Sequence, residues 1–165
     1  MPSDAQRTKR EAEAGERRVV REAQTSDSAQ IKRILDEASL TSFESNDPLG
    51  AAANQTASSR VHVCEVSGEV LAVLQWRQVG PEAEIFDVAV DTAHRRQGFA
   101  SLLLEAVLST TKVHGANVIF LEVRESNVAA LSLYKKFGFS VTGRRSNYYR
   151  DPAEAALLLR LNLTG

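Results

Sequence analysis

The sequence feature that most constrains the fold of this chain is a basic turn between an apolar segment and an amphipathic segment. Residues 94–100 read His-Arg-Arg-Gln-Gly-Phe-Ala, after the strand-like segment 85–90 and at the start of the helix-like segment 99–114. Such a strand–turn–helix points backbone N–H groups outward at a helix start, where the helix dipole adds partial positive charge. Gly98 allows the backbone to approach a ligand closely, and Ala100 keeps the helix face thin. The pattern predicts a pyrophosphate-binding turn.

The same turn has a simpler interpretation, a helix N-terminus with a glycine and solvated arginines. It is not the dinucleotide-binding Gly-x-Gly-x-x-Gly pattern, because it holds one glycine. It is not a Walker A loop either, because no Gly-Lys-Ser/Thr follows. The choice between a phosphate site and a solvated helix start depends on the segment downstream.

The composition limits the classes of protein to which this chain can belong. With 165 residues, 43% of them hydrophobic and 25% charged, we expect one soluble globular domain. The net charge of −1 argues against a dedicated nucleic-acid surface. Cys64 is the single cysteine, so an internal disulfide is impossible, and its apolar surroundings favour a buried structural role.

Residues 1–17 are polar and charged throughout, which predicts a flexible N-terminal tail before one domain spanning 18–165. They do not resemble a signal peptide, and no apolar stretch reaches the length of a membrane span. We therefore expect a cytoplasmic protein.

Hydrophobic periodicity predicts alternating strands and helices, with an order of β-α-α-β-β-β-α-β-α-β-β. Strands are expected at 19–23, 61–66, 70–78, 83–90, 118–123, 140–143 and 155–163, and helices at 28–38, 48–55, 99–114 and 128–137. A strand–helix–strand unit over 83–123 requires a parallel crossover, whereas the flanking hairpins are antiparallel. The predicted fold class is α/β, a mixed, mostly antiparallel sheet with helices on both faces.

A second group of residues could carry chemistry. Glu122 lies near the carboxyl end of a predicted strand, the edge where open α/β sheets bind ligands. Asn127 and Tyr134 are seven residues apart on one helix and share a face. A carboxylate, an amide and a phenol could therefore converge. Taken singly, Glu122 could be a solvated charge, and Tyr134 a core aromatic with its hydroxyl at the surface.

Together, these segments resemble one known family. Arg-x-x-Gly-x-Ala at 95–100 is similar to the acetyl-CoA pyrophosphate motif of the GNAT acetyltransferases. Residues 121–139 read Leu-Glu-Val-Arg-x-Ser-Asn-x-x-Ala-x-x-Leu-Tyr-x-x-x-Gly-Phe, which resembles the RimI-like ribosomal-protein alanine N-acetyltransferase branch. Residues 143–149 are similar to that branch's Gly-Arg-Arg-x-x-Tyr-Tyr segment. The resemblance covers 85–163 closely and the first half in outline.

The resemblance implies a GNAT fold and direct acetyl transfer from acetyl-CoA to an amine, without an acyl-enzyme and without a metal. It implies that Glu122 is the general base and Tyr134 the general acid for the leaving thiolate. The implied cofactor-contacting residues are Val88, Ala89, Val90, Arg95, Arg96, Gln97, Gly98, Phe99, Ala100, Ser101 and Asn127. The implied acceptor-side residues are Phe43, Tyr148 and Tyr149.

Two segments depart from the branch pattern where the acceptor would bind. The branch carries a Phe-Pro-Trp-like segment between its first two helices, but residues 42–48 here keep only Phe43 and a displaced Pro48. After Tyr-Tyr the branch often has Glu-Asp-Ala, and this chain has Glu-Ala-Ala at 154–156. These changes leave the identity of the acceptor open.

The leading hypothesis is an acetyl-CoA-dependent N-acetyltransferase acting on a protein N-terminal amine. A rival within the same family acetylates a small amine or a lysine side chain. A hypothesis of another class is a non-catalytic acyl-CoA-binding module, which would need neither Glu122 nor Tyr134. A nucleotide- or nucleic-acid-binding protein is disfavoured by the near-neutral charge. No membrane partner is expected, and the sequence does not indicate the oligomeric state.

Overall fold

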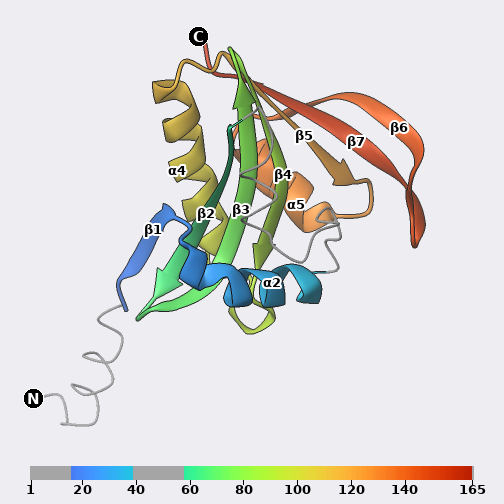
Figure 1. Ribbon diagram of the computed structural model, residues 1–165. Helices are drawn as coiled ribbons and strands as arrows, with labels where there is room; N and C mark the ends of the chain where they lie inside the picture. The colour runs from blue at the N-terminus through green and yellow to red at the C-terminus, as the bar shows by residue number, and fades with distance from the viewer. Residues whose placement is uncertain (1–15, 39–57, 165) are drawn as a thin grey trace, which may run out of the picture.

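The computed structural model describes residues 16–38 and 58–164, which form one seven-stranded sheet with helices on both faces (Figure 1). The strands are β1 (Arg18–Glu22), β2 (Ser58–Val66), β3 (Glu69–Val79), β4 (Glu82–Val90), β5 (Val118–Arg124), β6 (Ser140–Arg150) and β7 (Ala153–Asn162). The helices are α2 (Ser28–Glu37), α4 (Phe99–Val113) and α5 (Val128–Lys136), with short 3-10 turns η1 (Thr25–Asp27) and η2 (Thr92–His94). The strand order is β1-β2-β3-β4-β5-β7-β6.

The β4–β5 pair is parallel and the other strand pairs are antiparallel, which confirms the predicted mixed sheet. The parallel pairing is short. It runs from Glu82↔Val118 to Ile85↔Leu121 and stops there. At this point β4 bulges against β3, because Gln75 pairs with Asp87 while the next residue, Trp76, pairs with Ile85. Past the bulge, the carboxyl halves of β4 and β5 separate, and Figure 1 shows β5 turning away from β4.

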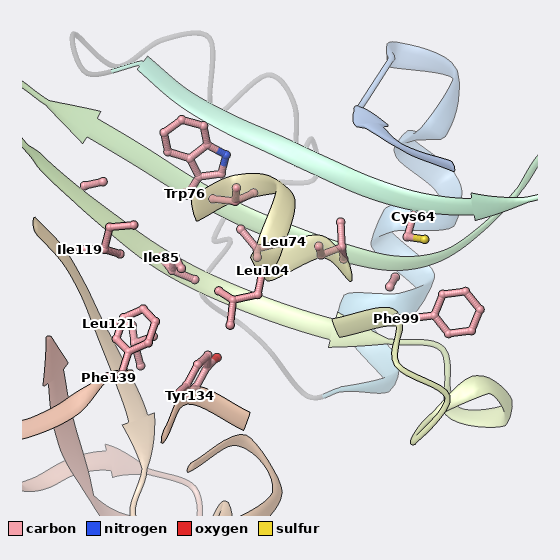
Figure 2. Close-up of a cluster of buried hydrophobic side chains, with 14 of the residues drawn as sticks. Cys64, Leu74, Trp76, Ile85, Phe99, Leu104, Ile119, Leu121, Tyr134 and Phe139 are labelled. Carbon is pink, nitrogen blue, oxygen red and sulfur yellow. The ribbon is translucent and has the colours of Figure 1, made fainter. Parts of the chain in front are cut away.

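Two hydrophobic clusters hold the helices on the sheet. On one face, buried Ile31 and Ile34 of α2 pack with Val63 and Val73 of the central strands. On the other face, α4 and α5 cover a larger cluster around Trp76. Figure 2 shows this cluster with Phe99 and Cys64 at one end and Tyr134, Leu121 and Phe139 at the other. Cys64 is fully buried, as predicted.

Local turns and caps fix the ends of several elements. The turn between β2 and β3 is Ser67–Gly68, and both residues have positive φ, as a tight hairpin requires. Gly115 follows the end of α4 with a φ of 83°. Asn127 is the N-cap of α5, and its side chain accepts a hydrogen bond from the Ala130 N–H.

The buried face of α4 carries Phe99, Leu103, Leu104, Val107 and Thr111. One local prediction is wrong in its bounds. β6 does not end at Gly143 but continues to Arg150, because β7 supplies hydrogen-bonding partners along an exposed, polar edge strand. On α5 the most buried residue is Tyr134, whereas Leu133 and Phe137 are only half-buried.

The predicted strand at 118–123 packs one of its faces into the α4–α5 cluster. Ile119, Leu121 and Val123 are buried in the α4–α5 cluster. Phe120 and Glu122 alternate onto the opposite face and are half-buried. The predicted helix at 48–55, Phe43 and Pro48, and residues 1–15 of the predicted tail lie outside the described residues.

Candidate active site

The predicted pyrophosphate turn lies between β4 and α4. After η2 the chain passes through Arg96, with a φ of 60°, and Gly98, with a φ of 87°. An L-residue such as arginine rarely adopts this left-handed conformation, and such strain concentrates at ligand sites. Gly98 is the N-cap of α4, so the unbonded N–H groups of the first helical turn follow it directly. The guanidinium groups of Arg95 and Arg96 are exposed beside them.

The start of this turn is fixed to α2 by Asp91. Its carboxylate accepts hydrogen bonds from Arg33 at 2.6 Å and from the Ala93 N–H at 3.1 Å. The Nδ1 atom of His94 lies 2.7 Å from the same carboxylate. The Arg33 hydrogen bond is the main reason that the pKa of Asp91 falls to about 2, and the contact with His94 adds to it. The turn therefore begins at a charged anchor.

The predicted cofactor strand, 88–90, is the part of β4 beyond the bulge. Ala89 packs its side chain into the α2 cluster, and the half-buried Val88 and Val90 pack against the α4 cluster. One edge of this segment pairs with β3. Within the described chain, the other edge faces the gap left by β5. Its backbone groups can therefore pair with an extended ligand.

Glu122 is the first β5 residue after pairing with β4 ends. Its side chain is 23% exposed, and its carboxylate lies 2.8 Å from the Arg145 guanidinium. It also accepts a hydrogen bond from the Tyr148 hydroxyl, which raises the pKa of that tyrosine. Glu122 thus lies where β4 and β5 separate, and two hydrogen-bond donors, Arg145 and Tyr148, are directed at its carboxylate.

The predicted acceptor-side tyrosines lie together on β6. The Tyr148 and Tyr149 rings are 5.0 Å apart and perpendicular. Arg124 of β5 stacks 4.0 Å from the centre of the Tyr149 ring. Glu154 of β7 binds the Arg124 guanidinium at 3.4 Å. These contacts hold the β6–β7 hairpin, which Figure 1 shows extending from the sheet, against the Glu122 strand.

Tyr134 enters the site from the opposite layer. It is 7% exposed, and its ring lies 5.7 Å from that of Phe139 (Figure 2). Burial raises the pKa of its hydroxyl well above the ordinary value, and the charges of Asp87 and Tyr149 raise it further. The phenol therefore lies within electrostatic range of both the β4 bulge and the tyrosine pair. At neutral pH it keeps its proton and can donate it to a hydrogen bond.

The structure thus brings most of the predicted site residues to one gap. The predicted cofactor contact Asn127 also has a structural role, as the cap of α5. Its side-chain oxygen already caps α5, 3.1 Å from the Ala130 N–H. The side-chain NH₂ is then the group that can face a ligand.

Two residues were not singled out from the sequence. Asp87, 4% exposed, lies in the bulge itself and showed the same signal as Glu122, an acid within an apolar strand. Arg145 lies in the Gly-Arg-Arg segment at 143–149, but its ion pair with Glu122 could not be predicted, because it depends on how β6 returns beside β7.

A hollow of about 330 Å³ extends from Glu122 along the sheet, away from the pyrophosphate turn. Phe120 and Leu158 form apolar parts of its wall. An ion pair between Arg77 and Glu84, 2.7 Å long, forms a charged part. The hollow thus lies on the side of Glu122 opposite the turn.

Sequence comparison finds a protein family and individual proteins that resemble this chain. The profile of the acetyltransferase (GNAT) family matches residues 28–139. The chain is 36% identical, over 100 residues, to the [ribosomal protein bS18]-alanine N-acetyltransferase of Escherichia coli strain K12, covering 59% of this chain and 68% of that protein.

Two solved structures have the same fold. The ribosomal-protein-S18-alanine N-acetyltransferase from Escherichia coli superposes with a TM-score of 0.77 and 30% identity, covering 90% of this chain and 96% of the other. Ard1 from Thermoplasma volcanium superposes with a TM-score of 0.78 and 30% identity, covering 90% of this chain and 99% of the other.

None of the helices in the described ranges has the length and apolar character needed to cross a membrane.

The Asp91 anchor predicts a pH-dependent stability. The folded pKa of about 2 lies below the ordinary value of 3.8, so the contribution is complete above that value and lost as pH falls toward 2. We expect Asp91→Asn to lower the free energy of unfolding by about 2 kcal/mol near neutral pH, and by less near pH 3.

Urea unfolding of both proteins at about pH 7 and about pH 3 measures this difference. Asp36→Asn is the matched control, because Asp36 forms an exposed ion pair with Lys32 on the same helix. A difference between Asp91→Asn and the unmutated protein that stays constant across this range would contradict the assignment.

Proposed function

We propose that this chain, which belongs to the GNAT acetyltransferase family, transfers the acetyl group of acetyl-CoA to the N-terminal amine of a protein. The observation that carries the proposal is the place of Glu122, where β4 and β5 part. On one side lies the gap that leads to the pyrophosphate turn, and on the other lies the hollow. A donor and an acceptor could therefore meet at this carboxylate.

In this proposal the gap holds acetyl-CoA. The free edge of 88–90 pairs with the extended pantetheine arm, as a missing strand would, and holds the thioester near Glu122. The turn at 95–101 takes the pyrophosphate, since helix N–H groups and two arginines favour negative charge there. Both are supported by the match to the acetyltransferase family profile over 28–139.

The reaction needs one proton removed and one supplied. Glu122 accepts a proton from the acceptor's ammonium group, directly or through water, and the free amine attacks the thioester carbonyl carbon. The carbonyl re-forms as the C–S bond breaks, and the thiolate leaves beside Tyr134. The attacking nitrogen loses its second proton, and the leaving thiolate takes up that proton directly or through water. An ordinary thiol has a pKa of about 8.5, below that of a phenol. Tyr134, with its raised pKa, therefore stabilises the thiolate mainly by hydrogen bonding.

Arg145 and Tyr148 hold the Glu122 carboxylate at the place where a cationic substrate would bind. Both direct donors at the Glu122 carboxylate, in the place that the acceptor's ammonium must approach. Arg145 is 55% exposed and can swing into solvent as the ammonium takes its position. The Glu122 carboxylate is thus held by these two side chains until the acceptor arrives.

The relatives favour a protein N-terminus as the acceptor. The Escherichia coli relative is named for the alanine of ribosomal protein bS18, and we extend an N-terminal alanine to this chain as its preferred acceptor. The hollow beyond Glu122 has room for the residues that follow such an amine. The cytoplasmic location remains a prediction.

An acceptor panel tests this function. We expect acetyl-CoA and the enzyme to acetylate a short peptide with a free N-terminal alanine, detected by mass spectrometry. The same peptide with a blocked N-terminus and an internal lysine should stay unmodified, and so should free lysine and spermidine. Equal modification of the blocked peptide on its lysine, or of spermidine alone, would overturn the N-terminal assignment.

Removing the base should affect turnover and not binding. Glu122→Gln keeps the size and a hydrogen-bonding oxygen but cannot take up the proton, so kcat should fall by about 10²- to 10⁴-fold while CoA affinity is retained. Glu125→Gln is the control, because this acid lies three residues away in an exposed ion pair with Arg144. A nearly normal rate in Glu122→Gln would place the base elsewhere.

The role of Tyr134 is tested by two substitutions with different predicted losses. Tyr134→Phe should slow transfer and leave CoA affinity and melting temperature nearly unchanged, since the ring still fills its place beside Phe139. Tyr134→Ala should also lose about 3–5 kcal/mol of stability through the cavity it leaves. Full activity of Tyr134→Phe would reduce Tyr134 to a packing residue.

A further inference from the structure

Arg18, the first residue of β1, reaches across to the pyrophosphate turn. Its guanidinium Nη1 donates a hydrogen bond of 2.6 Å to the carbonyl of Gln97, a residue 79 positions later in the chain. The same guanidinium lies over the Phe99 ring, 4.3 Å from its centre. It also passes close to Gly98, where an added Cβ would lie 3.7 Å from Nη1. One side chain thus touches three consecutive residues of the turn.

The hydrogen bond to Gln97 fixes the direction of a neighbouring N–H. The carbonyl of Gln97 and the N–H of Gly98 belong to one planar trans peptide, in which the two groups point in opposite directions. With the carbonyl held by Arg18, the Gly98 N–H must point away from β1. As the N-cap of α4, Gly98 has an N–H that no helix carbonyl can accept. It is left to an outside acceptor.

The contact with Phe99 fixes the start of the helix itself. Phe99 is the first residue of α4 and is 3% exposed. Arg18 covers one face of its ring, and His94 approaches at right angles, 6.2 Å between ring centres. His94 is in turn held by Asp91. The turn is therefore held at both ends, by Asp91 where it begins and by Arg18 where the helix begins.

We infer that Arg18 is a positioning residue for the pyrophosphate of CoA, which it serves by fixing the Gln97–Gly98 peptide so that the Gly98 N–H faces the phosphate. The inference rests on the proposed binding of CoA at this turn. An arginine suits this role because its planar guanidinium can stack on a ring and donate in its plane at the same time. Lysine has a compact ammonium and cannot do both.

Two variants of similar size separate the hydrogen bond from simple packing. Arg18→Met keeps an apolar stem over Phe99 but has no donor. Arg18→Gln has a shorter reach and no charge but can still donate to the Gln97 carbonyl. The control is Arg17→Met, because Arg17 is exposed, adjacent and equally charged, and it lies outside the turn contacts. Isothermal titration with CoA measures each affinity, and the melting temperature of each free protein reports its fold.

We expect Arg18→Met to weaken CoA binding about ten-fold, as the loss of one charge-assisted hydrogen bond to a phosphate would. Arg18→Gln should recover part of that loss, and Arg17→Met should bind as the unmutated protein does. The loss should be the same with 3′-dephospho-CoA, and binding of pantetheine should not change. In kinetics, KM for acetyl-CoA should rise while kcat and KM for the acceptor hold.

Other outcomes overturn the inference. Unchanged CoA affinity in Arg18→Met, or an equal loss in Arg17→Met, would leave Arg18 without a specific role. A loss with CoA but not with 3′-dephospho-CoA would make Arg18 a direct contact of the 3′-phosphate. A loss that extends to pantetheine would make its role one of general stability. Failure of the proposed function is distinct, because then the unmutated protein would bind no CoA.

Discussion

Parallel strands that stop pairing partway along leave backbone groups that need partners, and this constraint organises the whole site. β4 and β5 pair over four residues and then part at the β4 bulge. Buried N–H and C=O groups rarely go unpaired, and the edge of 88–90 that faces the gap pairs with no described strand, so it is available to an extended ligand or water. The same separation leaves Glu122 at the point where the two strands part. In the proposed function, cofactor binding and acceptor activation both follow from this one break in the sheet.

The break is stable because the layers on either side are fixed independently. On one face of the sheet, α4 and α5 share one hydrophobic cluster that extends from Phe99 to Tyr134. On the other face, α2 is held by its own cluster and by the Arg33–Asp91 ion pair. The N-terminal third of the chain therefore does more than complete the sheet. Through Arg33 and Arg18 it holds both ends of the turn that lies more than fifty residues downstream.

Much of this fold could be predicted from the sequence because the signals are local. Apolar segments indicated β2 to β5, and the strand–turn–helix pattern at 85–114 located the start of α4. The length of β6 could not be predicted, since its polar residues are ordered by pairing with β7 and not by burial. The Glu122–Arg145 and Arg18–Gln97 contacts were also beyond reach, because each joins strands or turns distant in sequence. Tyr134 is a core ring, as one of its two interpretations held, and its part in the reaction stays a prediction.

Backbone hydrogen exchange in the presence and absence of CoA tests the central claim, that the gap between β4 and β5 is where the cofactor lies. The account predicts that CoA slows exchange at the amides of Val88 and Val90, whose N–H groups point away from β3, and at those of 97–100. Amides of the β6–β7 hairpin should be affected much less, because it lies on the acceptor side of Glu122. Protection confined to that hairpin, or none at 88–90 under saturating CoA, would contradict the account.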